Sequence, residues 1–421
     1  MGAFVIRGCE IYLGGAFVPA ELEVRGGVVT ALGGGIVPGE GASVYNFKNC
    51  IVVPGLADVH VHLREPGFSY KETVASGTRA AARSGYAALC AMPNLSPVPE
   101  DAATLAQELE IIRRDAVIDV LPYGAITRGQ RGEQLADMAA MSPYVCGFSD
   151  DGRGVQSREL MRAAMLEAKR LGKPIAAHCE DNSLLRGGYI HAGEYAKAHG
   201  HRGICSESEW GPIARDIELL RETGCAYHVC HISTAESAAL IRSAKREGLD
   251  ITCETAPHYL LLSDSDLQED GRFKMNPPLR SERDRLALIE ALRDGTIDIL
   301  ATDHAPHSAE EKSRGLAGSA FGITGLETAF PLLWTGLVEP GIISRERLVE
   351  LMSTAPARRF GIESGIEPGG PATFAVFETE TTYRIDPERF ASKGRATPFA
   401  GREVRGRCVL NIVRGREVWR A

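Results

Sequence analysis

The stretch LADVHVHLREPG, residues 56–67, is an apolar run that ends in two histidines and continues into charged residues and Pro-Gly. Side chains on a strand alternate with period two, so His60 and His62 are expected to share one face at its end. Two imidazoles on one face indicate half of a metal site, although a lone His-x-His pair also occurs by coincidence. The rest of the chain has to distinguish these interpretations.

Seven further apolar runs resemble the first, and helical patterns lie between many of them. The eight runs are LADVHVH, YAALCAMPN, VIDVLPYGA, YVCGFSDD, PIAAHC, CAYHVCHIS, DITCETAPH and IDILATDHAPH. The helical patterns include residues 71–85, 157–172, 207–224, 235–248 and 281–295, each of which ends in glycine. Strands that alternate with helices predict a parallel sheet, and eight such units predict an α/β fold of the (β/α)8 TIM-barrel type. An open doubly wound sheet is the alternative.

The two ends of the chain differ from this middle part and resemble each other. Both contain short β-prone pieces separated by glycine-rich turns, such as AELEVRGGVVTALGGG near the start and GREVRGRCVLNIVRGREVWR at the end. We therefore predict a small β-sandwich domain formed by both termini, residues 1–53 and 356–421, beside a barrel of residues 54–355.

Composition restricts the class of protein. The chain has 421 residues, 44% of them hydrophobic and 24% charged, and a net charge of -8. Such a chain is long enough to bury a large core, and its acidity argues against nucleic acid or an anionic membrane as the main partner. A small anionic substrate remains compatible, because local arginines can act against the global charge.

Targeting signals and cysteine spacing point to the cytoplasm. The N-terminal residues lack a basic region followed by a long apolar stretch, and the apolar run at 328–343 is interrupted by two prolines. The ten cysteines contain no CxxC pair. We read them as reduced, mostly buried thiols and predict a cytoplasmic protein without membrane spans.

Unusual polar residues gather at the C-terminal ends of seven of the eight predicted strands. In order along the chain they are His60, His62, Asn94, Asp150, Asp151, His178, His231, His258, Asp303, His304 and His307. In an α/β barrel this rim is where active sites are built. A single histidine is more often a core or surface residue than a ligand, but this many at one level of the barrel favour a shared site.

The predicted ligand set suits a hydrolytic metal centre. Imidazoles with one or two carboxylates, and no cysteine pair nearby, are typical of Zn²⁺ or a similar divalent ion in an open catalytic site. A carboxylate can bridge two ions, and Asp303 would then be free to move a proton from water to a leaving nitrogen. The chain has no GxSxG elbow and no GK[ST] phosphate loop, so the sequence does not support a serine hydrolase or a P-loop protein.

Eight motifs in order resemble the motif series of type I dihydroorotases, in the amidohydrolase superfamily. They are ADVHVHLREPG, AMPN, GFSDDG, AHCEDNSL, CHIST, FKMNPPLR, ATDHAPH and FGITGLETAF. The resemblance covers the barrel from about residue 50 to 360, and the flanking termini resemble the small β domain of the family. It implies zinc-dependent, reversible cyclisation of N-carbamoyl-L-aspartate to L-dihydroorotate, a step of de novo pyrimidine biosynthesis.

The resemblance also implies roles for individual residues. His60 and His62 would bind one zinc ion, His178 and His231 a second, and Asp151 would bridge them, with one or two ions per subunit. Asp303 would act as general acid and base beside the metal. The substrate-binding residues would be Arg64, Asn94, Asn276 and His307. Self-association and an aspartate transcarbamoylase partner are further expectations of this resemblance.

The sequence allows more than one interpretation of several residues. Asp150 could be the bridge in place of Asp151, but adjacent strand residues point oppositely and we favour Asp151. Glu65 reads as a structural or solvated residue, and Cys179 should point away from the metal. His228 and His258 could be ligands or packing residues. Residues 306–322 read as a flexible loop over the site, either a lid or simply disordered.

Two alternative functions remain open on sequence grounds. One is another cyclic amidase, a hydantoinase or allantoinase. Many of those enzymes bridge their metals with a carboxylated lysine on strand four, where this chain reads YVCGFSDDG and has no lysine. The other is a non-catalytic, dihydroorotase-like scaffold for aspartate transcarbamoylase. Such homologues lose ligands, whereas this chain retains every proposed one.

Overall fold

The computed structural model describes residues 2–421, and its central part is a closed parallel barrel. All eight predicted strands form, in the sheet order β15-β14-β13-β10-β9-β8-β7-β6. Their bounds are β6 (Leu56–Val61), β7 (Tyr86–Ala91), β8 (Asp119–Ala125), β9 (Gly147–Ser149), β10 (Ile175–Ala177), β13 (Tyr227–Val229), β14 (Ile251–Thr255) and β15 (Ile299–Leu300). A parallel bridge between Val61 and His304 and a 2.9 Å hydrogen bond from the His62 amide to the His304 carbonyl join the two edges. The barrel prediction is therefore confirmed, and the open sheet is excluded.

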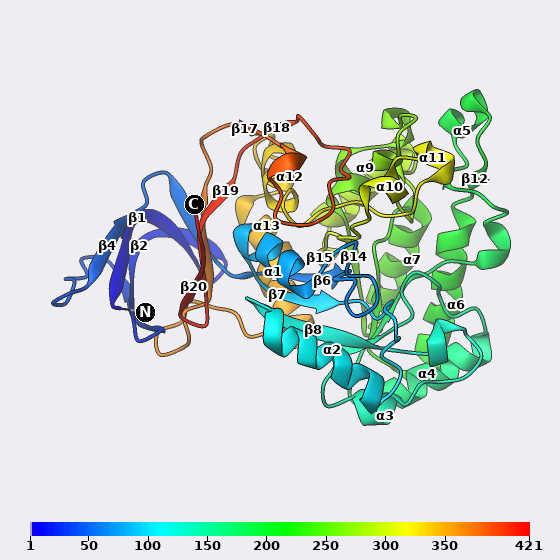
Figure 1. The fold of residues 1–421 in the computed structure, drawn as a ribbon, viewed down its shortest axis with the longest axis horizontal. Helices are drawn as coiled ribbons and strands as arrows, with labels where there is room; N and C mark the ends of the chain where they lie inside the picture. Colours follow the sequence, from blue (N-terminus) through cyan, green and yellow to red (C-terminus); the bar gives the residue numbers. More distant parts are fainter. Residues whose placement is uncertain (1) are drawn as a thin grey trace.

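Helices surround the barrel, and local capping signals set their ends (Figure 1). The five predicted patterns contain α1 (Val74–Arg83), α4 (Arg158–Arg170), α6 (Glu207–Thr223), α7 (Ala235–Arg246) and α9 (Glu282–Arg293), and α2 (Ala102–Asp115) is a further long helix. The N-cap side chains of Thr73, Asp101, Ser157, Thr234 and Ser281 each accept a hydrogen bond from a first-turn amide. Such caps satisfy amides that have no partner within the helix.

Shorter elements complete the barrel. They are α3 (Met138–Met141), β11 (Ile190–His191), α5 (Glu194–His199), β12 (Gly203–Ile204), α8 (Pro257–Leu261), α10 (Ala309–Lys312), α11 (Gly315–Gly318), α12 (Ala329–Leu333), α13 (Arg345–Val349) and α14 (Ala355–Phe360). Phe360 of α14 packs edge-on against the rings of Tyr123 and His228, with centroid distances of 6.0 and 5.3 Å. This contact fills the barrel interior opposite the rim that carries the polar residues.

Strands from both ends of the chain form one mixed sheet beside the barrel, where both termini lie (Figure 1). These strands are β1 (Phe4–Leu13), β2 (Ala16–Arg25), β3 (Val28–Gly33), β4 (Ser43–Asn46), β5 (Cys50–Pro54), β16 (Phe374–Glu378), β19 (Arg407–Val413) and β20 (Arg416–Arg420). Residues from both ends, such as Ile6, Leu22, Phe374 and Ile412, share a separate hydrophobic core. The small β domain is confirmed as a single mixed sheet with its own core, and its exact boundaries stay a prediction.

Part of the C-terminal segment lies on the barrel and not in this sheet. β17 (Tyr383–Arg384) and β18 (Glu403–Val404) pair with each other, and Ile385 and Val404 pack against Leu332 of α12. The carboxylate of Glu327 accepts hydrogen bonds from two backbone amides at residues 391 and 392. Residues 383–404 therefore cover one side of the barrel near the strand ends.

Residues 306–322 contain the short helices α10 and α11 and are held together by the side chain of Lys312. The sequence predicted either a lid or a disordered loop for this segment. The Lys312 ammonium is buried and donates to the carbonyls of Lys274, Ala320 and Gly322 at 2.7–3.0 Å. Three acceptors match the three N–H donors of an ammonium group. This loop is thus organised around a side chain that the sequence did not single out.

None of the helices in residues 2–421 is long and apolar enough to cross a membrane. All ten cysteines have free thiols, and nine of them are buried.

Candidate metal centre

Six of the predicted site residues converge at one rim of the barrel. His60 and His62 lie at the end of β6, and the other four follow β9, β10, β13 and β15; they are Asp151, His178, His231 and Asp303. All six are buried. Parallel strands that close into a barrel bring their carboxyl ends to the same edge, which is how residues up to 243 positions apart come into contact.

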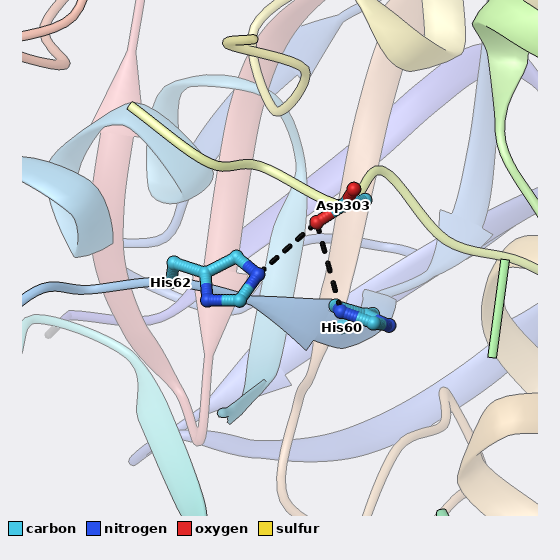
Figure 2. A group of neighbouring side chains, drawn as sticks. All are labelled: His60, His62 and Asp303. Atoms are coloured by element: carbon cyan, nitrogen blue, oxygen red, sulfur yellow. Dashed lines mark hydrogen bonds and ion pairs between the residues drawn. The ribbon is translucent and has the colours of Figure 1, made fainter. Parts of the chain in front are cut away.

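The first half of the site is the group His60, His62 and Asp303 (Figure 2). Oδ1 of Asp303 lies 3.1 Å from Nε2 of His62 and 3.6 Å from Nε2 of His60. One ligand atom from each of the three residues lies within 4.8 Å of the others. Side chains at this spacing can hold one metal ion between them.

The second half contains His178 and His231, and Asp151 lies between the halves. Oδ1 of Asp151 is 3.6 Å from Nδ1 of His178 and 3.5 Å from Nε2 of His231. The same carboxylate lies 3.3 Å from Nε2 of His60 and 3.5 Å from Nε2 of His62. Asp151 therefore faces four imidazoles, two from each half of the site.

Asp150 points away from the site, in line with strand alternation. Its carboxylate accepts hydrogen bonds from the backbone amides of Ile126 and Thr127 and from the Thr127 hydroxyl. Asp150 thus holds the turn after β8 in place. Of the two adjacent aspartates, only Asp151 is placed to bridge two ions.

The donor set fits a metal ion. Nε2 of His60 and Oδ1 of Asp151 are buried, and within residues 2–421 neither has a hydrogen-bond partner. Buried polar atoms are normally hydrogen-bonded, so a pair of unpartnered ones that face each other indicates a missing ligand. Imidazole nitrogens and carboxylate oxygens are donors that zinc accepts in open catalytic sites.

The two site carboxylates stay ionised. Burial raises the pKa of Asp151, but the surrounding imidazoles of His60, His178 and His231 leave that pKa well below the ordinary value. Burial also raises the pKa of Asp303, but the neighbouring imidazoles of His62 and His60 bring it below the ordinary value. Asp303 is therefore a carboxylate that can accept a proton.

Three residues of the site have backbone conformations that side chains disfavour. The φ angles of Arg64, His231 and Asp303 are 63°, 33° and 46°. A residue other than glycine in this region costs on the order of 1 kcal/mol or more, and such residues cluster at functional sites. The sharp turns let these side chains project from the rim towards one another.

Arg64 and His307 lie in contact and buried next to the predicted metal ligands. Nε of Arg64 donates to the Pro306 carbonyl at 3.2 Å, and Nη2 lies 3.3 Å from Nε2 of His307. Burial lowers the pKa of Arg64 to about 10, so its guanidinium remains charged at neutral pH. Burial and the charges of Arg64 and Lys71 lower the pKa of His307 to about 3, so its imidazole is neutral.

Asn94 contacts one of the six converging residues directly, and Asn276 is linked to another through Glu180. Oδ1 of Asn94 accepts from Nδ1 of His62 at 2.8 Å. Nδ2 of Asn276 donates to Glu180 at 2.9 Å, and Glu180 lies 3.6 Å from Nε2 of His178. The remaining amide groups of both asparagines are available to a bound molecule.

Other rim residues have structural contacts. Glu65 accepts from the amide of Val74 at the start of α1, and His304 lies 3.3 Å from Glu72. The Cys179 thiol is directed at the hydroxyl of Tyr227, 3.5 Å away, on the outer side of the strand. His258 is buried, and its Nε2 has no hydrogen-bond partner within the described chain. None of these four residues belongs to the six that converge.

Sequence reasoning missed Glu254 and left His228 undecided. Oε1 of Glu254 is 2.6 Å from Nδ1 of His60, and Oε2 is 3.1 Å from Nε2 of His228. His228 therefore contacts a carboxylate behind the site and does not face the other imidazoles. A glutamate within the buried strand DITCET was the available signal, because glutamate is almost never buried without a partner.

Comparison with known proteins identifies the family. The sequence model of a family described as dihydro-orotase-like matches residues 49–237. The chain is 47% identical to the dihydroorotase of Bacillus caldolyticus over 422 residues, which covers 100% of this chain and 99% of the relative. It is 46% identical over 415 residues to the dihydroorotase of Fusobacterium nucleatum, with 98% and 97% covered. The chain belongs to the dihydroorotase family.

Solved structures of cyclic amidases share the whole fold. The L-hydantoinase (dihydropyrimidinase) of Arthrobacter aurescens superposes with a TM-score of 0.88 at 25% identity, covering 100% of this chain and 96% of that one. A D-hydantoinase from Bacillus sp. AR9 gives 0.86 at 25% identity, covering 99% and 95%. The fold is thus common to several cyclic amidases, whereas sequence identity is far higher to dihydroorotases.

Family membership makes this chain an enzyme that hydrolyses a cyclic amide. The buried cluster of histidines and carboxylates is a candidate metal site that is consistent with this family.

Proposed function

We propose that this dihydroorotase uses two zinc ions to interconvert L-dihydroorotate and N-carbamoyl-L-aspartate in pyrimidine biosynthesis. His60, His62 and Asp303 would hold one ion, and His178 and His231 the other, with Asp151 between them. The observation that carries this proposal is the placement of Asp151, whose carboxylate lies 3.3–3.6 Å from all four imidazoles. When bound, zinc supplies a Lewis acid that polarises a carbonyl and lowers the pKa of water.

Asp303 moves the proton in the proposed reaction. In the hydrolytic direction its carboxylate takes a proton from the attacking water, whose oxygen bonds to the ring carbonyl carbon. The same carboxyl group then gives this proton to the ring nitrogen as the carbon–nitrogen bond breaks. An ionised Asp303 is required at the start, and its lowered pKa supports that state.

Arg64 anchors the substrate carboxylate in this proposal. Its guanidinium is buried, Nε donates to a backbone carbonyl and Nη2 contacts Nε2 of His307, so Nη1 and the second N–H of Nη2 remain for a carboxylate. Asn94 and His307 would contact the same substrate carboxylate, and Asn276 would contact the substrate ring. Such an anchor favours dihydroorotate over hydantoin or allantoin, because their rings lack this carboxylate.

A turnover assay on zinc-reconstituted protein tests the proposed function. Loss of dihydroorotate is followed with hydantoin and allantoin run in parallel. We expect rapid turnover of dihydroorotate only, with zinc content of two per chain. Preferred turnover of hydantoin or allantoin would instead assign the chain to the specificity of its structural neighbours.

Self-association and a transcarbamoylase partner also remain proposals. Light scattering of the purified chain, alone and mixed with an aspartate transcarbamoylase, measures both. A monomer that turns over dihydroorotate at the full rate by itself would contradict a need for either.

A further inference from the structure

The carboxylate of Glu254 contacts both halves of the metal centre from behind. Its Oε1 accepts a hydrogen bond from Nδ1 of His60 at 2.6 Å. The same oxygen accepts a hydrogen bond from the backbone amide of His231 at 3.2 Å. His60 belongs to the first half of the site and His231 to the second. One oxygen atom therefore connects residues that lie on β6 and after β13.

A buried chain of hydrogen bonds holds Glu254 in this position. Oε2 of Glu254 is 3.1 Å from Nε2 of His228, and Nδ1 of His228 is 2.8 Å from the hydroxyl of Thr252. Glu254 is 1% exposed and His228 is fully buried, so water does not compete for these bonds. His228 and Glu254 both project into the barrel interior, below the rim.

The hydrogen bonds of Glu254 also decide the tautomer of His60. A carboxylate only accepts, so Nδ1 of His60 must carry the proton that it donates. Nε2 of His60 is then the lone-pair nitrogen, and this atom faces Asp151 and Asp303. Metal-ligating histidines require this arrangement, in which the other ring nitrogen donates to a carboxylate.

The bond to His231 acts on the backbone. His231 has a φ of 33°, a conformation that an imidazole side chain does not favour on its own. A hydrogen bond from its amide to a buried carboxylate offsets this strain and keeps the turn after β13 in place. Nε2 of His231 is thereby held 3.5 Å from Asp151.

We propose that Glu254 is a positioning residue that couples the two halves of the metal centre, by orienting the His60 ring and the His231 backbone together. The proposal rests on the metal ligands given under the proposed function. Glu254 approaches His60 from the side opposite to Asp151 and Asp303, so it does not contact the reacting atoms. Its loss is expected to weaken both zinc sites and not one alone.

Zinc binding by variants of the whole chain tests this role directly. Glu254→Ala removes all three hydrogen bonds, whereas Glu254→Gln preserves the shape but turns one acceptor into a donor. Asp216→Asn is the matched control, because Asp216 is an equally buried carboxylate that accepts from Tyr227 on the outer side of the barrel. Zinc stoichiometry and affinity are measured in chelator-buffered zinc, with circular dichroism as the check on folding.

We expect Glu254→Ala to bind both ions about 10–100-fold more weakly, the usual effect of losing such a partner. Glu254→Gln should bind both ions less weakly than the alanine variant, with a loss of affinity on the order of tenfold. This variant tests the proposal if the alanine variant does not fold. The visible spectrum of the cobalt-substituted protein should change in both variants, because the His60 ring is reoriented. Asp216→Asn should keep the parental affinity and spectrum.

Parental affinity at both sites in folded Glu254 variants would overturn the positioning role and leave the proposed function intact. A parent chain that binds no zinc would overturn the metal centre itself, so the two failures are distinguishable. Sγ of Cys230 also lies within 4.8 Å of ligand atoms of His60 and Glu254. Selective loss of a third zinc equivalent, with two retained at parental affinity, would show that Glu254 is a ligand and would overturn the proposal.

Discussion

Replacing Arg64 should change substrate preference more than it changes chemistry. Arg64 is 8% exposed and uses Nε for the Pro306 carbonyl and one side of Nη2 for His307, which leaves Nη1 and the second N–H of Nη2 for two hydrogen bonds to a substrate carboxylate. Hydrogen bonds to charged groups contribute about 1.5–3 kcal/mol each. Arg64→Met removes both, or about 3–6 kcal/mol, which corresponds to a fall of roughly 10²–10⁴ in kcat/KM for dihydroorotate.

A conservative variant and a truncated substrate separate anchoring from other effects. Arg64→Lys keeps the charge but cannot reproduce the fork, so we expect a loss of roughly 10–100-fold. Dihydrouracil lacks the carboxylate, and its slower turnover should be almost unchanged by either substitution. The assay is loss of ring absorbance for both substrates, with zinc content measured in parallel.

The reasoning would be refuted by an Arg64→Met enzyme that retains kcat/KM for dihydroorotate within about threefold. An equal loss for dihydroorotate and dihydrouracil at full zinc content would also refute it. Arg64 would then act on the reaction centre and not on the carboxylate.

Three further outcomes follow from the structure. Asp303→Asn should lower kcat by about 10²–10⁴, since an amide cannot carry the proton from water to nitrogen, and a rate within tenfold of the parent would contradict that role. Asp151→Asn should lose zinc in metal analysis, whereas Asp150→Asn should keep zinc and lower only the resistance to urea, because Asp150 holds a turn. Burial raises the pKa of Glu108 well above its ordinary value, and its Oε2 lacks a partner within the described chain. Because the pKa of Glu108 is raised in the folded state, this side chain costs the parent protein stability as pH rises above about 4.5. Glu108→Gln should therefore resist urea better than the parent at pH 8, and this advantage should vanish near pH 4. Equal urea midpoints of variant and parent at pH 8 would contradict this.

Much of the barrel was predictable because strand and helix patterns are local. The runs that became the eight barrel strands are apolar for a physical reason, since strands of a closed parallel barrel are buried on both faces. The five long helical patterns end in glycine and each contains a helix of the structure, and four of these helices begin at a side-chain N-cap. The terminal sheet was harder to specify, because alternating strands do not reveal whether they form one sheet or two.

Strand periodicity also predicted part of the candidate site. The two-residue spacing of His60 and His62 puts both rings on one face, and the same alternation separates Asp151 from Asp150. The rim position of His178, His231 and Asp303 followed from counting strands, since every parallel strand ends at the same edge. These inferences need only the chain direction and the pleat.

The sequence by itself determined the barrel, the edge that carries the chemistry and the residue types of the metal centre. Only the tertiary structure decided which buried groups support that centre. Glu254 and His60 are 194 positions apart, and no periodicity relates a carboxylate on β14 to an imidazole nitrogen on β6. Their contact depends on barrel closure and on side-chain direction inside it, which are properties of the packed interior and not of any local stretch.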